Sequence, residues 1–455
     1  MIPRHVFALA LFAAPGILGA QSRDSTLNSI LQERVESKRA VGLVVGVLEK
    51  GRPAQVYTAG SSGSSVSLNG NSVFEIGSVT KVFTTAILAD MVRRGEVKLD
   101  DPVSKYLPAS VHVPSRGGKE ITLLDLATQS SGLPRMPDNF RPANPANPYA
   151  DYSVQQMYDF LSGYTLPRDI GSKFEYSNLG VGLLGHALSL RAHKSYEALV
   201  TERVLEPLGM NDTRITFTPA MMAHLAVGHT ATGSVVSNWD LPTLAGAGAL
   251  RSTMNDMLKF LGANLDSTLG PVALDLARAH TAIRNTDQPS MRIGLAWLTL
   301  TPFGAPITWH NGGTGGYHSF IGFDPTNNRG IVILANSTAS IDDIGLHMLE
   351  PRIPLAVAAV AKLHTEIAID PSKLDAYVGE FQLAPSFSLT ITKEGGALFG
   401  QATGQPKFPL YAESENDFFF KVTDAQITFV KDATGKVDSI VLHQGGANIP
   451  GKRMK

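Results

Sequence analysis

Two hydrophobic patterns divide the chain. As far as about residue 369, apolar positions recur every three or four residues in long segments, as in helices packed on one face, with a few β-branched runs between them. From Asp370 onward, short alternating segments such as FSLTITK and ITFVKD are separated by Gly, Asn and Asp turns. This second pattern predicts an all-β meander, either a small barrel or a sandwich, with a domain boundary near Ile369-Asp370-Pro371.

The first part of the chain is predicted to contain both strands and helices. The run VGLVVGVLEKGR (41–52) ends in a turn and is followed by a hairpin partner, QVYTAG. Two further segments, ITWHNGG (307–313) and SFIGFDP (319–325), bracket a glycine turn, and GIVILAN (330–336) is typical of a fully buried strand. The predicted helices lie within residues 24–38, 80–94, 121–134, 153–161, 179–192, 196–205, 254–264 and 342–364. A Pro- and Asn-rich segment from 134 to 149 is expected to be a long loop, and such loops are often functional.

Composition narrows the class of protein. The 455 residues are 43% hydrophobic and 17% charged, which is typical of a globular protein. A formal net charge of −1 gives no electrostatic reason to expect a nucleic-acid partner. The chain has no cysteine, which excludes disulfides, thiolate metal sites and a cysteine nucleophile. No histidine pair has the spacing of zinc ligands on a helix, so no metal is expected.

The N-terminus has the pattern of a secretory signal peptide. Arg4 and His5 precede an apolar stretch from Val6 to Leu18, and the small residues Gly19 and Ala20 follow. The stretch is too short to span a bilayer comfortably, so we predict cleavage after about Ala20 and no stable membrane span afterwards. A retained N-terminal anchor is the alternative. Export without disulfides favours a bacterial periplasm or the external medium.

The segment EIGSVTKVF (75–83) contains the first candidate for chemistry. It places Ser78 three residues before Lys81, so both side chains lie on one face if the segment is helical. A serine hydroxyl is a weak nucleophile until a base removes its proton. Lysine can be that base when burial or nearby positive charge lowers its pKa. A helix N-cap with a surface lysine explains the same short motif without any chemistry.

Two later segments offer further candidates. In FEYSNLG, Tyr176 and Asn178 can place a phenol and an amide in one pocket, although an N-capping asparagine beside a half-buried tyrosine explains them as well. In WHNGGTGG, His310 and Asn311 precede Gly312 and Gly313 on a predicted strand, where glycines let the backbone approach a ligand closely. The Gly313 N–H could then join the Ser78 N–H as an oxyanion hole, with His310 as a proton partner or carboxylate binder. A glycine-rich β-turn with a partly exposed histidine is the plainer interpretation.

One other glycine pattern is best explained by packing. The segment GVGLLG (180–185) matches the spacing of a dinucleotide-binding loop. That fingerprint requires a preceding strand, which Tyr176-Ser-Asn does not provide. Close packing of a helix against a neighbour explains these glycines better.

Together the three motifs, in the order SxxK, YxN and HxG, resemble those of the serine penicillin-recognising enzymes. The likeness is specifically to class C β-lactamases and serine D-Ala-D-Ala carboxypeptidases and esterases. It extends to FEIGSVTKVFT, LDDPVSKYLP, ITLLDLATQSSGLP, YSNLGVGLLG and FDPTNNRGIVILAN, and covers about Leu27 to His364. The C-terminal segment resembles the small lipocalin-like barrel that is appended to some members.

The resemblance implies a role for each matched residue. Ser78 would be the acylated nucleophile, Lys81 and Tyr176 the acid–base pair, and Asn178 a residue that orients substrate. The third motif departs from the family pattern, because β-lactamases of this class usually have Lys-Thr-Gly where this chain has His310-Asn-Gly. A lysine there would be a permanent cation for a substrate carboxylate, whereas histidine is mostly neutral near pH 7. The departure puts efficient β-lactam turnover in question and leaves acyl-enzyme chemistry intact.

The sequence thus predicts a signal peptide (1–20), a β-lactamase-like serine hydrolase domain (21–369) and a small all-β barrel (370–455). The hydrolase domain is expected to be α/β (α+β), with an antiparallel sheet flanked by helices. The substrate is expected to be a small molecule or short peptide: a β-lactam first, with a D-amino-acid peptide or an ester as alternatives. A catalytically silent protein that binds peptidoglycan or a peptide is the alternative from another class. No metal or organic cofactor is implied, and the oligomeric state is not determined by the sequence.

Overall fold

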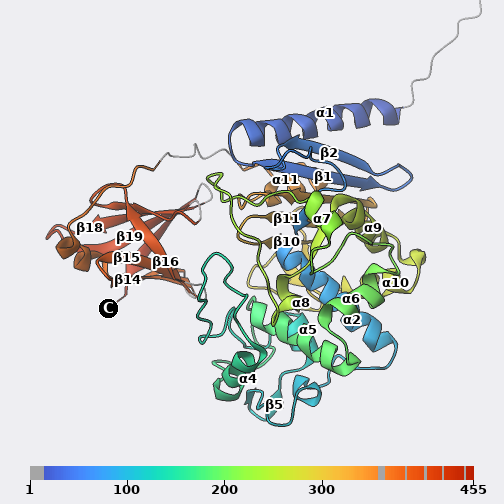
Figure 1. Ribbon diagram of the computed structural model, residues 1–455, viewed down its shortest axis with the longest axis horizontal. Helices are drawn as coiled ribbons and strands as arrows, with labels where there is room; N and C mark the ends of the chain where they lie inside the picture. Colours follow the sequence, from blue (N-terminus) through green and yellow to red (C-terminus); the bar gives the residue numbers. More distant parts are fainter. Residues whose placement is uncertain are drawn as a thin grey trace, which may run out of the picture.

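A computed structural model describes residues 15–356, 364–384, 387–403, 407–422, 425–444 and 447–454. It shows two bodies, a larger unit of helices around a sheet and a smaller all-β unit at the C-terminus (Figure 1). The predicted signal peptide lies partly outside the described residues. Helix α1 (Pro15–Glu36) begins within it and includes most of the helix expected over 24–38. Within the described part of the chain, no helix is both long and apolar enough to cross a membrane.

An antiparallel sheet forms the centre of the larger unit, with the strand order β2-β1-β12-β11-β10-β9-β8-β7 in the described residues. The predicted hairpin is confirmed as β1 (Gly42–Glu49) and β2 (Gln55–Gly60). The three strands expected late in the chain are confirmed as β10 (Ile307–Gly313), β11 (His318–Asp324) and β12 (Arg329–Ala335). The sheet is completed by β7 (Arg284–Asn285), β8 (Met291–Ile293) and β9 (Leu298–Leu300). Because β1 pairs with β12, the first and last strands of this unit in the sequence lie next to each other in the sheet.

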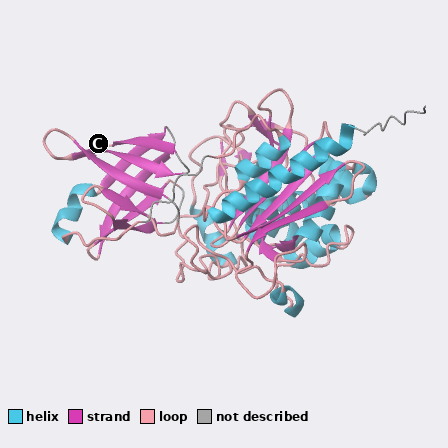
Figure 2. Cartoon of the chain, turned by 90° about the horizontal axis from the view of Figure 1, so that it is seen from above, coloured by secondary structure: helices cyan, strands magenta, loops and turns pink. Residues whose placement is uncertain are grey.

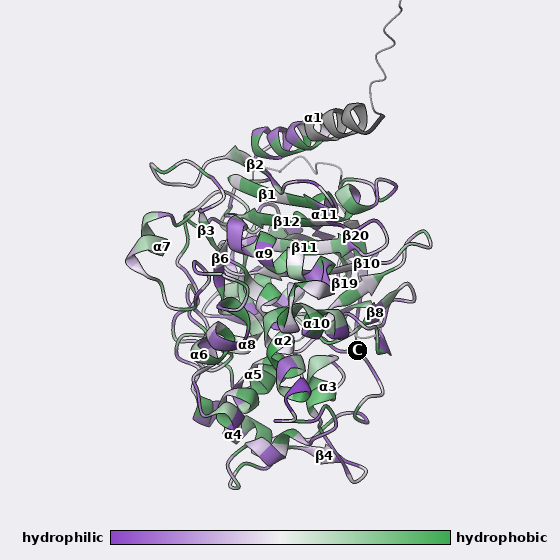
Figure 3. Ribbon diagram, turned by 90° about the vertical axis from the view of Figure 1, so that its right-hand side faces the viewer, coloured by the Kyte–Doolittle hydropathy of each residue, from purple (hydrophilic) through white to green (hydrophobic). Residues whose placement is uncertain are grey.

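Both faces of the sheet are buried, so the hydrophobic positions of β1 serve two separate cores. Leu43, Val45 and Val47 pack with α1 and with α11 (Asp342–Leu349). Val44 belongs to the larger core on the opposite face, with α2 (Thr80–Arg93) and α9 (Met254–Leu265). Figure 2 shows helices on either side of the strands, and Figure 3 shows the apolar colouring of β1 and β12 between them. A strand buried on both faces has to be apolar throughout, which explains the continuous run in the sequence.

The remaining α-helices lie mostly around the larger core, on the side of the sheet that α2 and α9 cover. They are α3 (Leu123–Ala127), α4 (Val154–Gly163), α5 (Asn178–Ala192), α6 (Tyr196–Val200), α7 (Pro219–Ala223), α8 (Ala245–Gly248) and α10 (Pro271–Ala279). Two short ribbons pair β3 (Val73–Glu75) with β6 (Arg251–Thr253), and β4 (Ser115–Arg116) with β5 (Lys119–Glu120). The glycines of α5 permit close packing as expected, because a Cβ on Gly185 would lie 3.0 Å from the Cα of Gly246 in α8.

The helix expected over 196–205 is confirmed, as α6 followed by a π-helical stretch, Thr201–Leu205. Two other helix predictions were too long. The helix expected over 121–134 is α3, which ends at Ala127. The helical material expected from 342 to 364 ends at Leu349, and residues 357–363 lie outside the described residues. Pro351 and Pro354 account for the early end, since proline removes a backbone donor and disfavours helix in the residue before it.

The C-terminal unit is a closed barrel in the described residues, as the alternating pattern predicted. It follows a 3₁₀ turn, Pro371–Tyr377, whose N-cap is Asp370. The strands are β13 (Gly379–Ala384), β14 (Phe387–Glu394), β15 (Ala397–Ala402), β16 (Lys407–Ala412), β17 (Asp417–Phe419), β18 (Ala425–Lys431), β19 (Val437–Gln444) and β20 (Ala447–Arg453). Pairing of β13 with β20 closes the barrel and leaves no unpaired sheet edge. The interior is filled by its own apolar cluster, which includes Phe381, Ile391 and Phe429.

Candidate active site

The serine of the first motif lies between the short ribbon and a buried helix. After β3 the chain makes a 3₁₀ turn, Gly77–Val79, and α2 begins at Thr80. Gly77 has φ +48°, and a Cβ there would lie 2.7 Å from the backbone nitrogen of Gly313 on β10. Only glycine fits this close crossing without strain. The crossing holds Ser78, which remains partly accessible, beside the end of a central strand.

Lys81 is fully buried one helical turn further on. Its Nζ lies 2.9 Å from Ser78 Oγ, 2.9 Å from Asn178 Oδ1 and 2.6 Å from the carbonyl oxygen of Ala247. Asn178 is the first residue of α5 and Ala247 lies in α8, so three separate segments hold this amine. The glycine-mediated approach of α5 and α8 is what brings both oxygens to it.

These contacts match a neutral amine. Burial, and secondarily the positive charge of Arg135, lower the pKa of Lys81 well below its usual value. A neutral amine has two N–H donors, which the Asn178 and Ala247 oxygens accept, and one lone pair, which is left for the Ser78 hydroxyl proton. Within the described residues no carboxylate lies within ion-pair distance of Lys81 Nζ, so the charged form gains little here. The arrangement therefore has the geometry of a nucleophile and its base.

Tyr176 lies over the same amine. Its ring centroid is 4.9 Å from Lys81 Nζ, and the Ser78 hydroxyl is near enough to the phenol to influence its pKa. Burial raises the pKa of Tyr176 to about 12, and the Ser78 contact and Arg135 oppose that rise. At neutral pH the phenol keeps its proton, so it can donate to a leaving group but is a poor base.

His310 reaches the site from β10. It is buried, its Nδ1 lies 2.6 Å from the Asn311 carbonyl oxygen, and burial followed by the nearby Lys81 lowers its pKa to about 4. The imidazole is therefore neutral at physiological pH. Of the two roles considered for this residue, this pKa disfavours a cationic carboxylate binder and favours a neutral hydrogen-bonding group.

The glycines after His310 lie against the nucleophile, but the Asn311 side chain does not. A Cβ on Gly312 would lie 2.1 Å from the Ile76 carbonyl oxygen and 2.8 Å from the Ser78 nitrogen. The Ser78 backbone nitrogen thus lies beside the Gly312-Gly313 backbone, as a shared oxyanion hole requires. Because side chains alternate along a strand, Asn311 faces α11 instead, where its Nδ2 donates to Asp342 Oδ2 at 2.6 Å. The expected contact of this side chain with substrate is therefore not supported.

Sequence reasoning missed three groups at the site. One is the Ala247 carbonyl, because a backbone oxygen leaves no trace in a residue pattern. The others are Arg135 and Tyr149, which come from a loop, and Trp239 packs behind Tyr149. The Arg135 guanidinium carbon is 4.9 Å from the Tyr176 ring centroid, and the Tyr149 and Trp239 ring centroids are 5.3 Å apart. The Pro- and Asn-rich character of 134–149 was the available indication for Arg135 and Tyr149, since long loops often carry functional residues.

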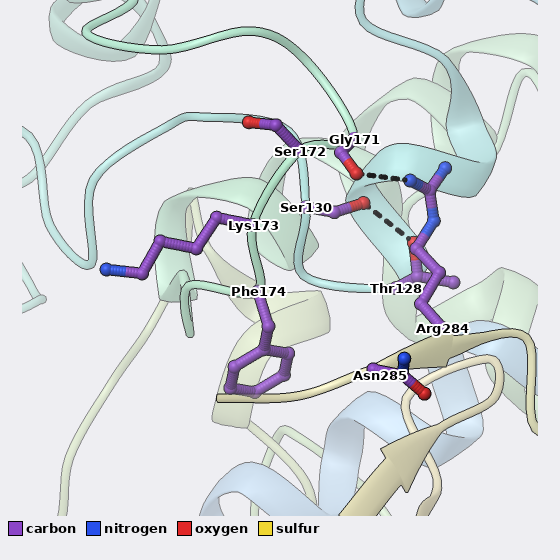
Figure 4. A pocket seen from close by; sticks show the side chains of 8 residues that line it. All are labelled: Thr128, Ser130, Gly171, Ser172, Lys173, Phe174, Arg284 and Asn285. Carbon is purple, nitrogen blue, oxygen red and sulfur yellow. Dashed lines mark hydrogen bonds between the residues drawn. The ribbon is translucent and has the colours of Figure 1, made fainter. Parts of the chain in front are cut away.

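A cavity of about 270 Å³ lies behind the second motif and is distinct from this site. Its lining includes Thr128, Ser130, Lys173 and Arg284, and it contains none of the predicted catalytic residues (Figure 4). The Arg284 guanidinium is already bonded to Asp125 at 2.7 Å and to the Gly171 carbonyl at 3.1 Å. Its charge is compensated, so Arg284 offers this cavity no free cation.

Comparison with known proteins identifies both units. The family model described as beta-lactamase matches residues 27–347, and a domain of unknown function (DUF3471) matches residues 363–453. The chain is 31% identical over 309 residues to the D-alanyl-D-alanine-carboxypeptidase/endopeptidase AmpH of Escherichia coli strain K12, covering 65% of this chain and 79% of that protein. It is 27% identical over 349 residues to a beta-lactamase of Pseudomonas fluorescens, covering 69% of this chain and 92% of that one.

Solved structures agree with the sequence relatives. A beta-lactamase/D-alanine carboxypeptidase from Yersinia pestis, complexed with citrate, superposes with a TM-score of 0.64 at 25% identity. The match covers 76% of this chain and all of that one. The resemblance inferred from the three motifs, and the fold class that it implied, are confirmed.

Proposed function

The chain belongs to the β-lactamase family of serine hydrolases, and from that premise we propose that it is an exported enzyme that cleaves an amide or ester through an acyl-enzyme on Ser78. One observation carries the proposal. A buried lysine amine, with a lowered pKa and both N–H groups engaged by carbonyl oxygens, lies 2.9 Å from a partly accessible serine hydroxyl. A catalytically silent binding protein would not need this arrangement.

Acylation follows from the positions of the groups. Lys81 Nζ takes the Ser78 hydroxyl proton as Oγ bonds to the substrate carbonyl carbon, and the carbonyl π electrons move to its oxygen. The Ser78 and Gly313 N–H groups are placed to stabilise that oxyanion. As the carbonyl re-forms, the C–N or C–O bond breaks and its electron pair leaves with the amine or alcohol, which receives a proton from Tyr176. Lys81 then restores the phenol's proton.

Deacylation is the same sequence with water as the nucleophile. Water loses a proton to the Lys81–Tyr176 pair as it attacks the acyl carbon, and the bond to Ser78 Oγ breaks with return of a proton to the hydroxyl. Asn178 keeps its amide oxygen on Lys81, so its side-chain N–H₂ is left to orient a substrate carbonyl. These steps consume one water for each bond that is cleaved and need no other reactant.

We assign D-amino-acid peptides or simple esters as the preferred substrates. The neutral His310 supplies no fixed charge for the carboxylate of a β-lactam, which a lysine at that position would supply. The first of the relatives named above is a D-alanyl-D-alanine carboxypeptidase, which agrees with this assignment. β-Lactam hydrolysis is the second candidate, favoured by the similarity to the Pseudomonas enzyme, and we expect β-lactams to acylate Ser78 with slow turnover.

The proposal of export rests on the N-terminal sequence. A charged start, a short apolar run and the small residues before Gln21 have the pattern that secretion signals share. A periplasmic or secreted location would also place the enzyme with cell-wall peptides. Sequencing the N-terminus of the protein recovered from a bacterial periplasm tests this point, and a mature chain that still begins at Met1 contradicts it.

A hydrolysis panel tests the function. Nitrocefin, a D-Ala-D-Ala peptide and 4-nitrophenyl butyrate are offered to the wild type and to Ser78→Ala. We expect hydrolysis of the ester and the peptide, slow or single-turnover reaction with nitrocefin, and no activity in the variant. Equal rates in Ser78→Ala, or no reaction of the wild type with any of the three, contradict the proposal.

A further inference from the structure

Arg135 is an exposed cation whose backbone is fixed at the edge of the active site. Its carbonyl oxygen accepts the backbone N–H groups of Asn178, at 3.0 Å, and Leu179, at 3.3 Å, at the start of α5. The Arg135 guanidinium carbon and Lys81 Nζ each lie 4.9 Å from the centroid of the Tyr176 ring. The backbone of Arg135 is therefore bonded to the first turn of α5, and this fixes where its side chain begins.

Among the described residues the guanidinium of Arg135 has no ion-pair partner, and it packs against the Tyr176 ring. Nearby arginines differ in this respect. Arg168 pairs with Glu175, and Arg284 is bonded to Asp125. Arg135 thus keeps all its N–H donors available on the solvent side, in a planar fork that matches a carboxylate.

The charge of Arg135 acts on several groups of the site. After burial it is the next cause of the lowered pKa of Lys81, and it opposes the burial that raises the pKa of Tyr176 and of Tyr149. Since burial disfavours the charged forms of Lys81 and His310, Arg135 provides a positive charge that does not depend on either of them.

A negative group lies on the other face of β10. Asp342 of α11 accepts from Asn311, lies 3.0 Å from His318 Nε2, and is near enough to His310 to oppose, weakly, the burial that lowers its pKa. The third motif supplies no lysine for a substrate carboxylate. Arg135, by contrast, offers a cation at the Tyr176 side of the site.

We propose that Arg135 is a specificity residue that receives a carboxylate of the substrate through its free guanidinium. This inference rests on the proposed function and adds to it the substrate class: amides or esters that carry an anionic group within reach of Tyr176. The anion can belong to the acyl part or to the leaving group, and the experiment separates these two sources.

The test uses two pairs of esters that differ only in charge. In the acyl pair, 4-nitrophenyl hydrogen adipate is compared with 4-nitrophenyl hexanoate. In the leaving-group pair, 4-acetoxybenzoate is compared with its methyl ester. Each substrate is measured with wild type, Arg135→Gln, Arg135→Lys and the control Arg141→Gln, which removes a cation of the same loop whose guanidinium is bonded to the Phe140 carbonyl at 3.1 Å.

We expect Arg135→Gln to reduce kcat/KM for the anionic member of one pair by about tenfold, mainly through KM, because a charged hydrogen bond at an exposed site is lost. An effect of Arg135 on the pKa of Lys81 would change both members of a pair alike, so the diagnostic quantity is the ratio of kcat/KM for the anionic member to that for the neutral member. That ratio should fall by about tenfold in Arg135→Gln, and Arg135→Lys should recover part of the loss because it keeps the charge. Raising the salt concentration should weaken the wild-type preference for the anion. The pair that responds identifies which part of the substrate the arginine binds.

Other results overturn the inference. An equal loss for charged and neutral esters would mean that Arg135 acts only through the pKa values of Lys81 and Tyr176. A wild type that prefers neither anionic ester, or an Arg141→Gln variant as impaired as Arg135→Gln, would also refute a carboxylate subsite. Failure of the proposed function is distinguishable, since in that case Ser78→Ala would hydrolyse the neutral esters as fast as the wild type.

Discussion

Replacing Lys81 with methionine removes the proposed base while nearly preserving the volume of the side chain. In the wild type the amine is fully buried and in contact with Ser78 Oγ, Asn178 Oδ1 and the Ala247 carbonyl. Methionine leaves the two carbonyl oxygens without this donor, and it leaves the serine hydroxyl without a proton acceptor. The substitution should therefore affect stability moderately and chemistry severely.

The two effects differ in size. Each unsatisfied buried acceptor costs about 1–3 kcal/mol, but the same change removes an amine whose burial is itself costly, so the net loss of folding free energy should be about 1–3 kcal/mol. Loss of general-base catalysis is worth about 10²–10⁴ in rate, or about 3–5 kcal/mol of activation free energy. We expect kcat/KM to fall by about a thousandfold in a protein that is still folded.

The assay combines stopped-flow acylation by 4-nitrophenyl butyrate with urea unfolding of the same preparations. The wild-type acylation rate should rise with pH as Lys81 loses its proton, and Lys81→Met should lack that dependence because the titrating base is gone. The control is Lys259→Met, which removes an amine bonded to Asp256 at 2.8 Å on an exposed side of α9. It should keep wild-type kinetics. A Lys81→Met enzyme within tenfold of the wild type would refute the assignment of Lys81 as the base.

Three other changes test the rest of the site. Gly312→Ala should lower kcat by about 10²–10³, because the added methyl meets the Ile76 carbonyl and the Ser78 nitrogen at the proposed oxyanion hole. Gly163→Ala is the kinetic control, since its Cβ meets nothing within 4 Å. Tyr176→Phe should slow amide cleavage by about a hundredfold and nitrophenyl-ester cleavage much less, because only the amine leaving group needs the phenol's proton. His310→Gln should leave the shape of the pH–rate profile between pH 5 and 8 unchanged, since the pKa of His310 is about 4; a profile that changes near pH 6.5 contradicts this. Because the unfolded histidine binds a proton more readily than the folded one, the wild type should lose about 2 kcal/mol of stability more than His310→Gln between pH 7 and pH 5, measured by urea unfolding.

Local patterns in the sequence predicted the local elements well. The buried run that became β1, the helix after Ser78 and the alternating strands of the barrel each follow from spacing and turn residues. The helix expected from 342 to 364 was wrong because apolar composition outweighed the prolines at 351 and 354. Strands β7, β8 and β9 were not predicted, since two or three residues are too few to show an alternation.

The sequence predicted which motifs form the candidate site, but not how all of their side chains are arranged in space. Side chains that act within one turn, such as Ser78 and Lys81, are fixed by helical spacing. The Ala247 carbonyl and the Arg135 guanidinium depend on how remote segments pack, which residue order does not reveal. Asn311 shows the same limit, because the face to which a strand residue points depends on the register of the whole sheet.

The most direct test of the account is the covalent state of Ser78. The protein is treated with a fluorophosphonate or a penicillin, its intact mass is measured, and the modified peptide is identified by fragmentation. We predict one adduct per chain, located on Ser78, and no adduct in Ser78→Ala. An adduct on another residue, or an unmodified wild type with both reagents, would contradict the central claim that this hydroxyl is the nucleophile.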